Sequence, residues 1–89
     1  MNERTYRIEL TPRAERDLLG LPSTIQRRLI PRIDALAHEP RPPGVRKLSG
    51  AEELYRVRSG DYRIIYEIRD RLLLILIVHV RHRREAYRR

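Results

Sequence analysis

The chain lacks cysteine, phenylalanine and tryptophan, and it has one lysine among its twenty basic residues. Without cysteine it has no disulfide framework and no thiolate metal site. Small secreted domains usually depend on disulfides, so this absence favours a reducing, cytoplasmic location. Without phenylalanine and tryptophan, the core must be built from Leu, Ile, Val and the five tyrosines. A length of 89 residues predicts a single domain over residues 1–89.

Long apolar segments are also absent. The first four residues contain no apolar stretch of the kind that a signal peptide needs. The longest apolar run, residues 72–78, is far too short to cross a bilayer and is typical of a buried strand. We therefore expect no membrane association.

Positive charge is the main feature of the composition. Twenty basic residues against twelve acidic ones give a net charge of +8 at pH 7, and every basic residue except Lys47 is an arginine. Arginine forms forked contacts with phosphate groups and stacks on bases. Genome composition can explain the choice of arginine over lysine, but it does not explain the net excess. The excess predicts a polyanionic partner, most naturally a nucleic acid.

The hydrophobic pattern of the first half predicts a strand and two helices. Residues 6–10 alternate apolar and polar side chains, which indicates a short strand. Thr11-Pro12 is a typical helix start, and Gly20 is expected to end this first helix. Apolar residues at spacings of three and four over residues 25–37 predict a second helix, with Ser23 as its cap.

The second half predicts strands. A proline-rich loop at residues 40–44 is followed by short apolar stretches at residues 45–48, 54–58, 61–68 and 72–80. The last stretch is apolar on both faces, so it should be a central strand. We therefore expect an α+β fold of order β-α-α-β-β-β, in which the strands after the helices number three, or four if residues 45–48 also form one. Two helices should pack on one face of a small antiparallel sheet, and a short basic tail should follow from Arg81.

The expected hairpin gathers arginines on one sheet face. With Ser59-Gly60 as a two-residue turn, Arg58 lies opposite Asp61 and Arg56 lies opposite Arg63. Because side chains alternate along a strand, these four residues share one face and the tyrosines share the core face. A like-charged cross-strand pair destabilises a sheet by roughly 0.2–1 kcal/mol, which makes sense if an anion binds between the arginines. The alternative is a solvated face with Arg58 paired to Asp61.

A second basic cluster follows the last strand. A strand order without crossovers would bring Arg83 and Tyr87 close to the arginine face. The alternative is a disordered basic tail that binds polyanions without specificity. Against it, Tyr87 has nothing apolar nearby in the sequence to pack on. We find no His, Asp or Glu cluster at ligand spacing, no glycine-rich phosphate loop and no Ser/His/Asp grouping, so we expect no metal and no cofactor.

Three segments together resemble the RelE/ParE toxin superfamily, on its RelE-like side. They are Lys47-Leu48-Ser49-Gly50, LYRVRSGDYRIIYEI over residues 54–68 and VHVRHRREAYR over residues 78–88. The resemblance covers nearly the whole chain. It implies a toxin of a toxin–antitoxin pair that cleaves mRNA in the ribosomal A site without a metal ion. A cognate antitoxin protein would neutralise it in a hetero-oligomer.

The resemblance also implies which residues form the site. By position, the implied catalytic residues are Arg56, Arg58, Arg63, Arg83 and Tyr87. The residues expected to bind RNA beside them are Lys47, Arg81, His82 and Arg84. Two departures stand out, since some members have lysine at the first two catalytic positions and many have glycine where this chain has Arg81.

The implied reaction is attack of a ribose 2′-hydroxyl on the neighbouring phosphate. The strand arginines would stabilise charge on the phosphorane as fixed cationic donors. Tyr87 is the expected base, because nearby cations favour its phenolate form. The resemblance gives Arg83 an acid-like role. A guanidinium is a poor proton donor, so His82 or a ribosomal group is physically preferable.

Three alternatives stay open at this point. ParE-like relatives share the fold but poison DNA gyrase, although Arg63, Arg83 and Tyr87 together favour the RNase side. A non-catalytic module could use the same basic face to bind RNA or DNA. A third alternative is an RNase-like toxin that lost its activity, with Arg81 as the suspect change.

Overall fold

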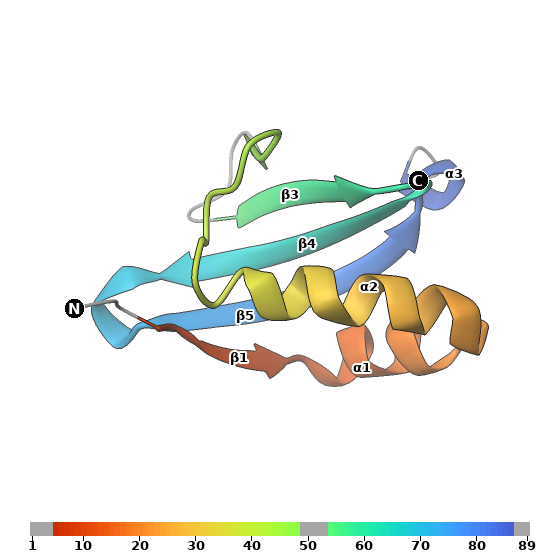
Figure 1. The fold of residues 1–89 in the computed structure, drawn as a ribbon, viewed down its shortest axis with the longest axis horizontal. Helices are drawn as coiled ribbons and strands as arrows, with labels where there is room; N and C mark the ends of the chain where they lie inside the picture. The colour runs from red at the N-terminus through yellow and green to blue at the C-terminus, as the bar shows by residue number, and fades with distance from the viewer. Residues whose placement is uncertain (1–4, 49–53, 87–89) are drawn as a thin grey trace.

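The computed structural model describes residues 5–48 and 54–86, and its core is a five-stranded sheet with two helices on one face (Figure 1). In chain order the elements are β1 (Arg7–Leu10), α1 (Pro12–Leu19), α2 (Ser23–Ala35), β2 (Arg46–Lys47), β3 (Leu54–Ser59), β4 (Tyr62–Arg69), the 3-10 turn η1 (Asp70–Leu72), β5 (Leu74–His82) and α3 (Arg83–Ala86). This order confirms the predicted α+β class. None of the helices in the described part of the chain is long and apolar enough to cross a membrane.

The strands lie in the order β1-β5-β4-β3-β2. From β2 to β5 every pair is antiparallel, as predicted, but β1 runs parallel to β5, so the sheet is mixed. Strand β5 lies between β1 and β4, which confirms the central position that its apolar faces predicted. The alternation of apolar and polar residues identifies β1 as a strand but does not reveal its partner. That partner, β5, is separated from β1 in the sequence by the two helices and the other strands.

The core lies between the helices and one face of the sheet. Leu29 and Ile33 of α2 and its C-cap residue Leu36 are buried, at the spacing that the sequence predicted. They pack with Ala14 and Leu18 of α1 and with a layer of strand side chains. The largest fully buried side chain in this layer is Tyr66 of β4. The described core is thus aliphatic and tyrosine-based, as a chain without phenylalanine and tryptophan requires.

The first helix is tied to the edge of β5. Thr11 is its N-cap: the side-chain oxygen accepts from the Ala14 N–H at 3.0 Å and donates to the Val78 carbonyl at 3.1 Å. Six residues after Thr11, the Asp17 carboxylate accepts from the Val80 N–H at 3.1 Å. These contacts occupy backbone groups of β5 beyond the end of β1, and they hold the strand that leads into the basic tail.

The second helix begins one residue earlier than predicted. Pro22 is the N-cap, with extended backbone and no side-chain hydrogen bond, and Ser23 is already helical. The ring of Pro22 holds its φ at −56°, and its carbonyl accepts from the Gln26 N–H, so a side-chain cap is not needed to start the helix. Pro31 lies inside α2, which continues through it to Ala35.

The hairpin between β3 and β4 turns one residue later than predicted. Gly60 and Asp61 are the central residues, and Ser59 lies opposite Tyr62. Gly60 has φ +61°, which suits the first central position of a two-residue turn, whereas the predicted turn would have placed Ser59 there. The predicted pairing of Arg56 with Arg63 is therefore wrong, and Arg63 faces Arg58. The predicted pairing of Arg58 with Asp61 is wrong too, because Asp61 lies in the turn and not on the strand. The register moves by two residues, an even number, so the arginines and tyrosines of the two strands keep their predicted faces.

Candidate functional site

Three arginines form a row across the sheet face that the helices leave uncovered. Arg58 of β3 lies opposite Arg63 of β4, and Arg63 lies opposite Arg81 of β5. We call Arg58, Arg63 and Arg81 the arginine row. Directly opposed like charges destabilise a sheet, so the row contains two unfavourable pairs. An anion bound over the row would offset this repulsion.

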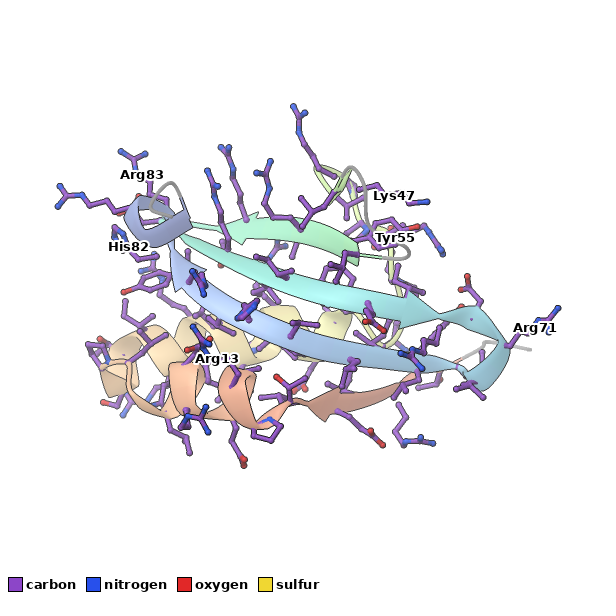
Figure 2. The ribbon with its side chains drawn as sticks, turned by 180° about the vertical axis from the view of Figure 1, so that it is seen from behind. Arg13, Lys47, Tyr55, Arg71, His82 and Arg83 are labelled. Atoms are coloured by element: carbon purple, nitrogen blue, oxygen red, sulfur yellow. The ribbon has the colours of Figure 1, made fainter. Side chains whose placement is uncertain are left out.

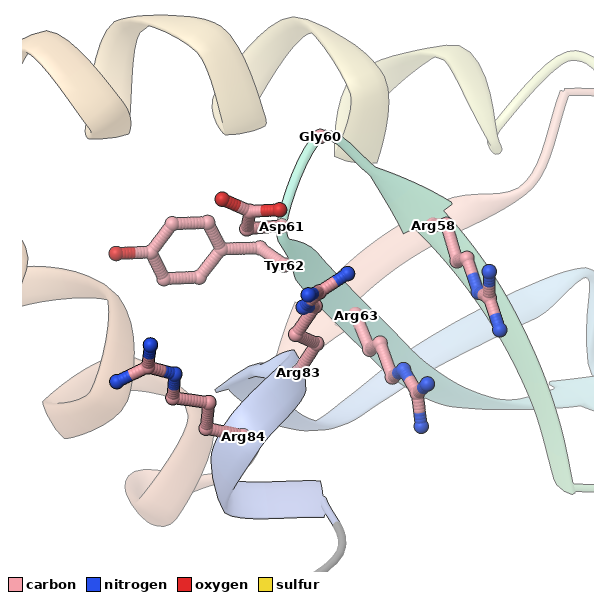
Figure 3. A pocket seen from close by; sticks show the side chains of 7 residues that line it. All are labelled: Arg58, Gly60, Asp61, Tyr62, Arg63, Arg83 and Arg84. Atoms are coloured by element: carbon pink, nitrogen blue, oxygen red, sulfur yellow. The ribbon is translucent and has the colours of Figure 1, made fainter.

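A pocket lies at the hairpin end of the row. It has a volume of about 360 Å³ and is lined by Arg58, Gly60, Asp61, Tyr62, Arg63, Arg83 and Arg84. We call it the hairpin pocket. Its described lining contains four arginines and one carboxylate, so its net charge is positive. In Figure 3, Arg58 and Arg63 extend side by side from neighbouring strands, and Arg83 reaches in from α3.

Arg63 lies deepest in this group, with 5% of its surface exposed. A guanidinium at this depth is held in a fixed place and acts in surroundings of lower dielectric than water. Its fork of donors suits phosphate oxygens, which accept two parallel hydrogen bonds. The pocket therefore offers a preorganised cation to an anionic group that reaches it.

The tail is anchored to the hairpin through its backbone. The Arg83 N–H donates to the Asp61 carbonyl at 2.7 Å, so α3 begins against the turn between β3 and β4. The Arg84 N–H donates to Nδ1 of His82 at 3.1 Å. These contacts place Arg83 and Arg84 in the hairpin pocket, so Arg83 lies beside the arginine face as expected. The other residue of this expectation, Tyr87, is not among the described residues.

His82 lies on the other side of the sheet from Arg81. Its ring packs edge-on against Tyr62, with 5.1 Å between the ring centroids. Since Nδ1 accepts the hydrogen bond from Arg84, a neutral His82 carries its proton on Nε2. His82 thus anchors the tail and does not line the hairpin pocket.

The remaining predicted residues fall in three places. Arg56 and Lys47 line a second, neighbouring pocket that shares Arg58 with the first. Arg81 completes the arginine row. Tyr87 lies outside the described residues. The described site thus unites Arg58, Arg63, Arg83 and Arg84, with Arg81 beside them.

Sequence reasoning missed basic residues that reach the site from other elements. Arg32 of α2 donates to the Arg58 carbonyl at 2.8 Å, and the Arg28 side chain approaches Gly60. Arg46 of β2 lies opposite Arg56. Local patterns do not show contacts between a helix and a distant hairpin. The pairing of Arg46 could have been found by aligning residues 45–48 with β3 as an edge strand.

His79 lies on the same sheet face as the row, and its pKa is lowered. Burial of the ring is the largest cause, and the neighbouring Arg81 and Arg13 act in the same direction. Asp17 lies 3.9 Å from Nδ1 and acts in the opposite direction. We expect burial to dominate, because the Asp17 carboxylate already accepts from the Val80 N–H.

The lowered pKa predicts a pH dependence of stability. Below about pH 6.5 the unfolded chain binds a proton at His79 more readily than the folded chain does. The free energy of unfolding should therefore fall as the pH falls below this value, and it should fall less in His79→Gln. Urea denaturation of both proteins at pH 7.5 and pH 5.5 tests this. Equal losses in the two proteins would show that His79 does not contribute.

The chemistry of the described site is that of fixed cations. No group of three or more His, Cys, Asp or Glu side chains gathers within residues 5–48 and 54–86 in a way that could hold a metal ion. Its cationic donors come from two strands and a helix and converge on one pocket. Such a site stabilises negative charge on an oxyanion, and phosphate is the group that its geometry suits best.

Known proteins that resemble this chain are toxins of toxin–antitoxin systems. The family model for the ParE toxin of type II toxin–antitoxin systems (parDE) matches residues 8–87. The toxin RelE of Mycobacterium tuberculosis is 31% identical over 88 residues, which cover 98% of this chain and 91% of that protein.

Solved structures share the fold. The toxin in the archaeal RelE–RelB complex from Pyrococcus horikoshii matches with a TM-score of 0.78 and 36% identity, over 89% of this chain and 96% of that one. The M. tuberculosis toxin–antitoxin complex RelBE2 matches with a TM-score of 0.80 and 28% identity, over 92% of this chain and 98% of the matched chain.

Proposed function

Because this chain belongs to the RelE/ParE superfamily of toxins from type II toxin–antitoxin systems, we propose that it cleaves messenger RNA on the ribosome. The observation that carries the proposal is the arginine row with its pocket. Arg63 lies between Arg58 and Arg81 and is almost fully buried, and Arg83 approaches from α3. The fold does not need this concentration of positive charge, but a phosphate in its transition state does.

In the proposed reaction a ribose 2′-oxygen attacks the adjacent phosphorus. The bond from phosphorus to the 5′-oxygen breaks, and a 2′,3′-cyclic phosphate and a 5′-hydroxyl are formed. Arg58 and Arg63 stabilise the negative charge that develops on the non-bridging oxygens. Arg83, which reaches the pocket from α3, stabilises charge on the leaving oxygen. Arg56 belongs to the same face and supports a neighbouring phosphate.

Two protons move in this step. Tyr87, four residues beyond Arg83, is assigned as the base that takes the proton of the 2′-hydroxyl. The leaving 5′-oxygen needs a donor, and His82 is poorly placed because its ring packs against Tyr62. We therefore assign the second proton to a group of the ribosome, which would also position the RNA. Because the toxin would supply the base and the ribosome the acid, cleavage would take place on the ribosome, in the cytoplasm.

A cognate antitoxin is the proposed partner. RelE toxins of P. horikoshii and M. tuberculosis have been solved in complex with antitoxins, and their toxin chains share this fold. With a net charge of +8, this chain favours an acidic partner segment. Covering the hairpin pocket would exclude RNA, so co-expression of the antitoxin should restore growth.

Mapping RNA ends in cells tests the activity. Wild type, the double variant Arg63→Ala/Tyr87→Phe and the control Arg71→Ala are induced briefly, and mRNA 5′ ends are mapped by primer extension. We expect new ends inside translated frames, in step with codons, for wild type and for Arg71→Ala, and none for the double variant. Arg71 lies in η1, at the end of the molecule opposite Arg83 (Figure 2).

The same experiment tests a second candidate function. The matched family model is that of ParE toxins. The resemblance to the superfamily implies that its ParE-like side poisons DNA gyrase, so gyrase is the second candidate target. Growth arrest without new RNA ends would contradict the RNase proposal and favour gyrase. A supercoiling assay with purified gyrase would then be the decisive measurement.

A further inference from the structure

A second basic pocket adjoins the hairpin pocket along β3. It has a volume of about 610 Å³ and is lined by Gly44, Val45, Arg46, Lys47, Arg56 and Arg58. We call it the β2–β3 groove. Of its described lining residues, four are cationic and none is acidic. Since Arg58 lines both pockets, the groove and the hairpin pocket form one continuous basic surface.

The groove repeats the charge arrangement of the arginine row. Arg46 of β2 lies opposite Arg56 of β3, as Arg58 lies opposite Arg63. Two successive cross-strand positions on one sheet face are thus occupied by opposed arginines, each pair unfavourable by itself. Arg56 and Arg58 are two residues apart on β3, a separation of about 6.5–7 Å along the strand. This separation is close to that of successive phosphates in an extended RNA strand.

The loop that carries Arg46 is held in place from several sides. The Arg41 guanidinium donates to Asp70 at 3.1 Å and lies over the Tyr55 ring, 5.2 Å from its centroid. The Tyr66 hydroxyl donates to the Pro40 carbonyl at 2.7 Å. On the other side of β2, the Leu48 N–H donates to the Leu54 carbonyl at 2.9 Å. The backbone of Arg46 is therefore fixed before a ligand binds.

We propose that the β2–β3 groove is a second phosphate-binding subsite for single-stranded RNA. The strand lies along β3, with one phosphate in the hairpin pocket and the next between Arg46 and Arg56. This inference rests on the proposed action on RNA and adds the path of the strand. Arg46 thus contributes affinity and does not touch the reacting atoms.

Binding of an RNA that cannot be cleaved tests the subsite directly. The probe is a fluorescein-labelled single-stranded RNA of nine nucleotides with 2′-O-methyl groups, which blocks 2′-hydroxyl attack. Anisotropy is measured with wild type, Arg46→Ala, Arg46→Lys and Arg71→Ala at several salt concentrations. Arg46 and Arg71 are both exposed, and each substitution to alanine removes one charge. Thermal melts confirm that all four proteins are folded.

Arg46→Ala should bind the probe about fivefold more weakly at 0.1 M salt, and its salt slope should be smaller by about 0.7. Arg46→Lys should restore most of the slope, since it keeps the charge. Arg71→Ala should bind like wild type, because Arg71 lies in η1 and is not one of the residues that line the groove. Equal affinities of Arg46→Ala and Arg71→Ala would overturn the subsite.

The two proposals fail in distinguishable ways. If brief induction gives no new RNA ends but Arg46→Ala still binds the probe more weakly than Arg71→Ala, cleavage is wrong and the RNA path stands. If RNA ends appear in step with codons and Arg46→Ala binds like the control, the strand leaves the hairpin pocket by another route and the subsite is wrong.

Discussion

Replacing Arg63 with alanine is expected to lower the rate of RNA cleavage by about two to three orders of magnitude. Arg63 is the central member of the arginine row and is only 5% exposed. A preorganised donor at this depth stabilises the charge that develops in the transition state without first displacing ordered water. Removing the Arg63 guanidinium should therefore lower the rate of the chemical step. The measurement is the initial rate of cleavage of a translated mRNA in a purified translation system.

Arg63→Lys separates charge from geometry in the same assay. Lysine keeps the positive charge but replaces the planar fork with a single ammonium group, so an intermediate rate is expected. Arg71→Ala is the matched control and should retain the wild-type rate. Circular dichroism establishes that each variant is folded. A folded Arg63→Ala protein that cleaves at the wild-type rate would remove Arg63 from the mechanism.

Replacing Tyr66 is expected to have the largest effect on stability. Its side chain is fully buried, its ring stacks on Tyr55 at 6.1 Å between centroids, and its hydroxyl donates to the Pro40 carbonyl at 2.7 Å. Tyr66→Ala should lower the free energy of unfolding by about 3–5 kcal/mol, through lost burial and the cavity left behind. This is a large part of the 5–15 kcal/mol typical of a domain.

Tyr66→Phe isolates the hydrogen bond. The ring stays, but the Pro40 carbonyl loses its donor, which costs about 1–3 kcal/mol if water does not replace it. Burial raises the pKa of Tyr66 to about 12, so its contribution to stability is constant near neutrality and decreases only above about pH 10. Urea denaturation at pH 7 therefore compares the proteins cleanly. Equal midpoints for wild type and Tyr66→Phe would contradict the role of this bond.

Features set by neighbouring residues could be predicted from the sequence. The cap at Thr11, the end of α1 at Gly20 and the buried stripe of α2 all follow from local spacing. The division of β3 and β4 into a basic face and a core face was also correct, because alternation does not depend on the partner strand. These local rules were enough to place Arg58 and Arg63 on one surface.

Features set by distant contacts could not be predicted in the same way. The turn register depended on which residue adopts a positive φ, and that choice decided whether Arg63 faces Arg56 or Arg58. The parallel pairing of β1 with β5 and the reach of Arg32 to the hairpin join residues far apart in the chain. The periodicity of the sequence carries no information on such distant pairs. It therefore predicts that Arg58 and Arg63 share a face, but it does not predict that Arg32 reaches the hairpin.

The short outer strands of the sheet have a consequence for self-association. An exposed strand edge is a template on which another chain can add a strand and begin to aggregate. Here β2 has only two residues, both cationic, and β1 has four, among them Arg7 and Glu9. Beyond the end of β1, the side chains of Thr11 and Asp17 form hydrogen bonds with the Val78 carbonyl and the Val80 N–H of β5. These two backbone groups are therefore not available to pair with another strand. A second copy would thus meet short outer strands that carry charged side chains, which disfavours fibril-like growth even when the chain is concentrated.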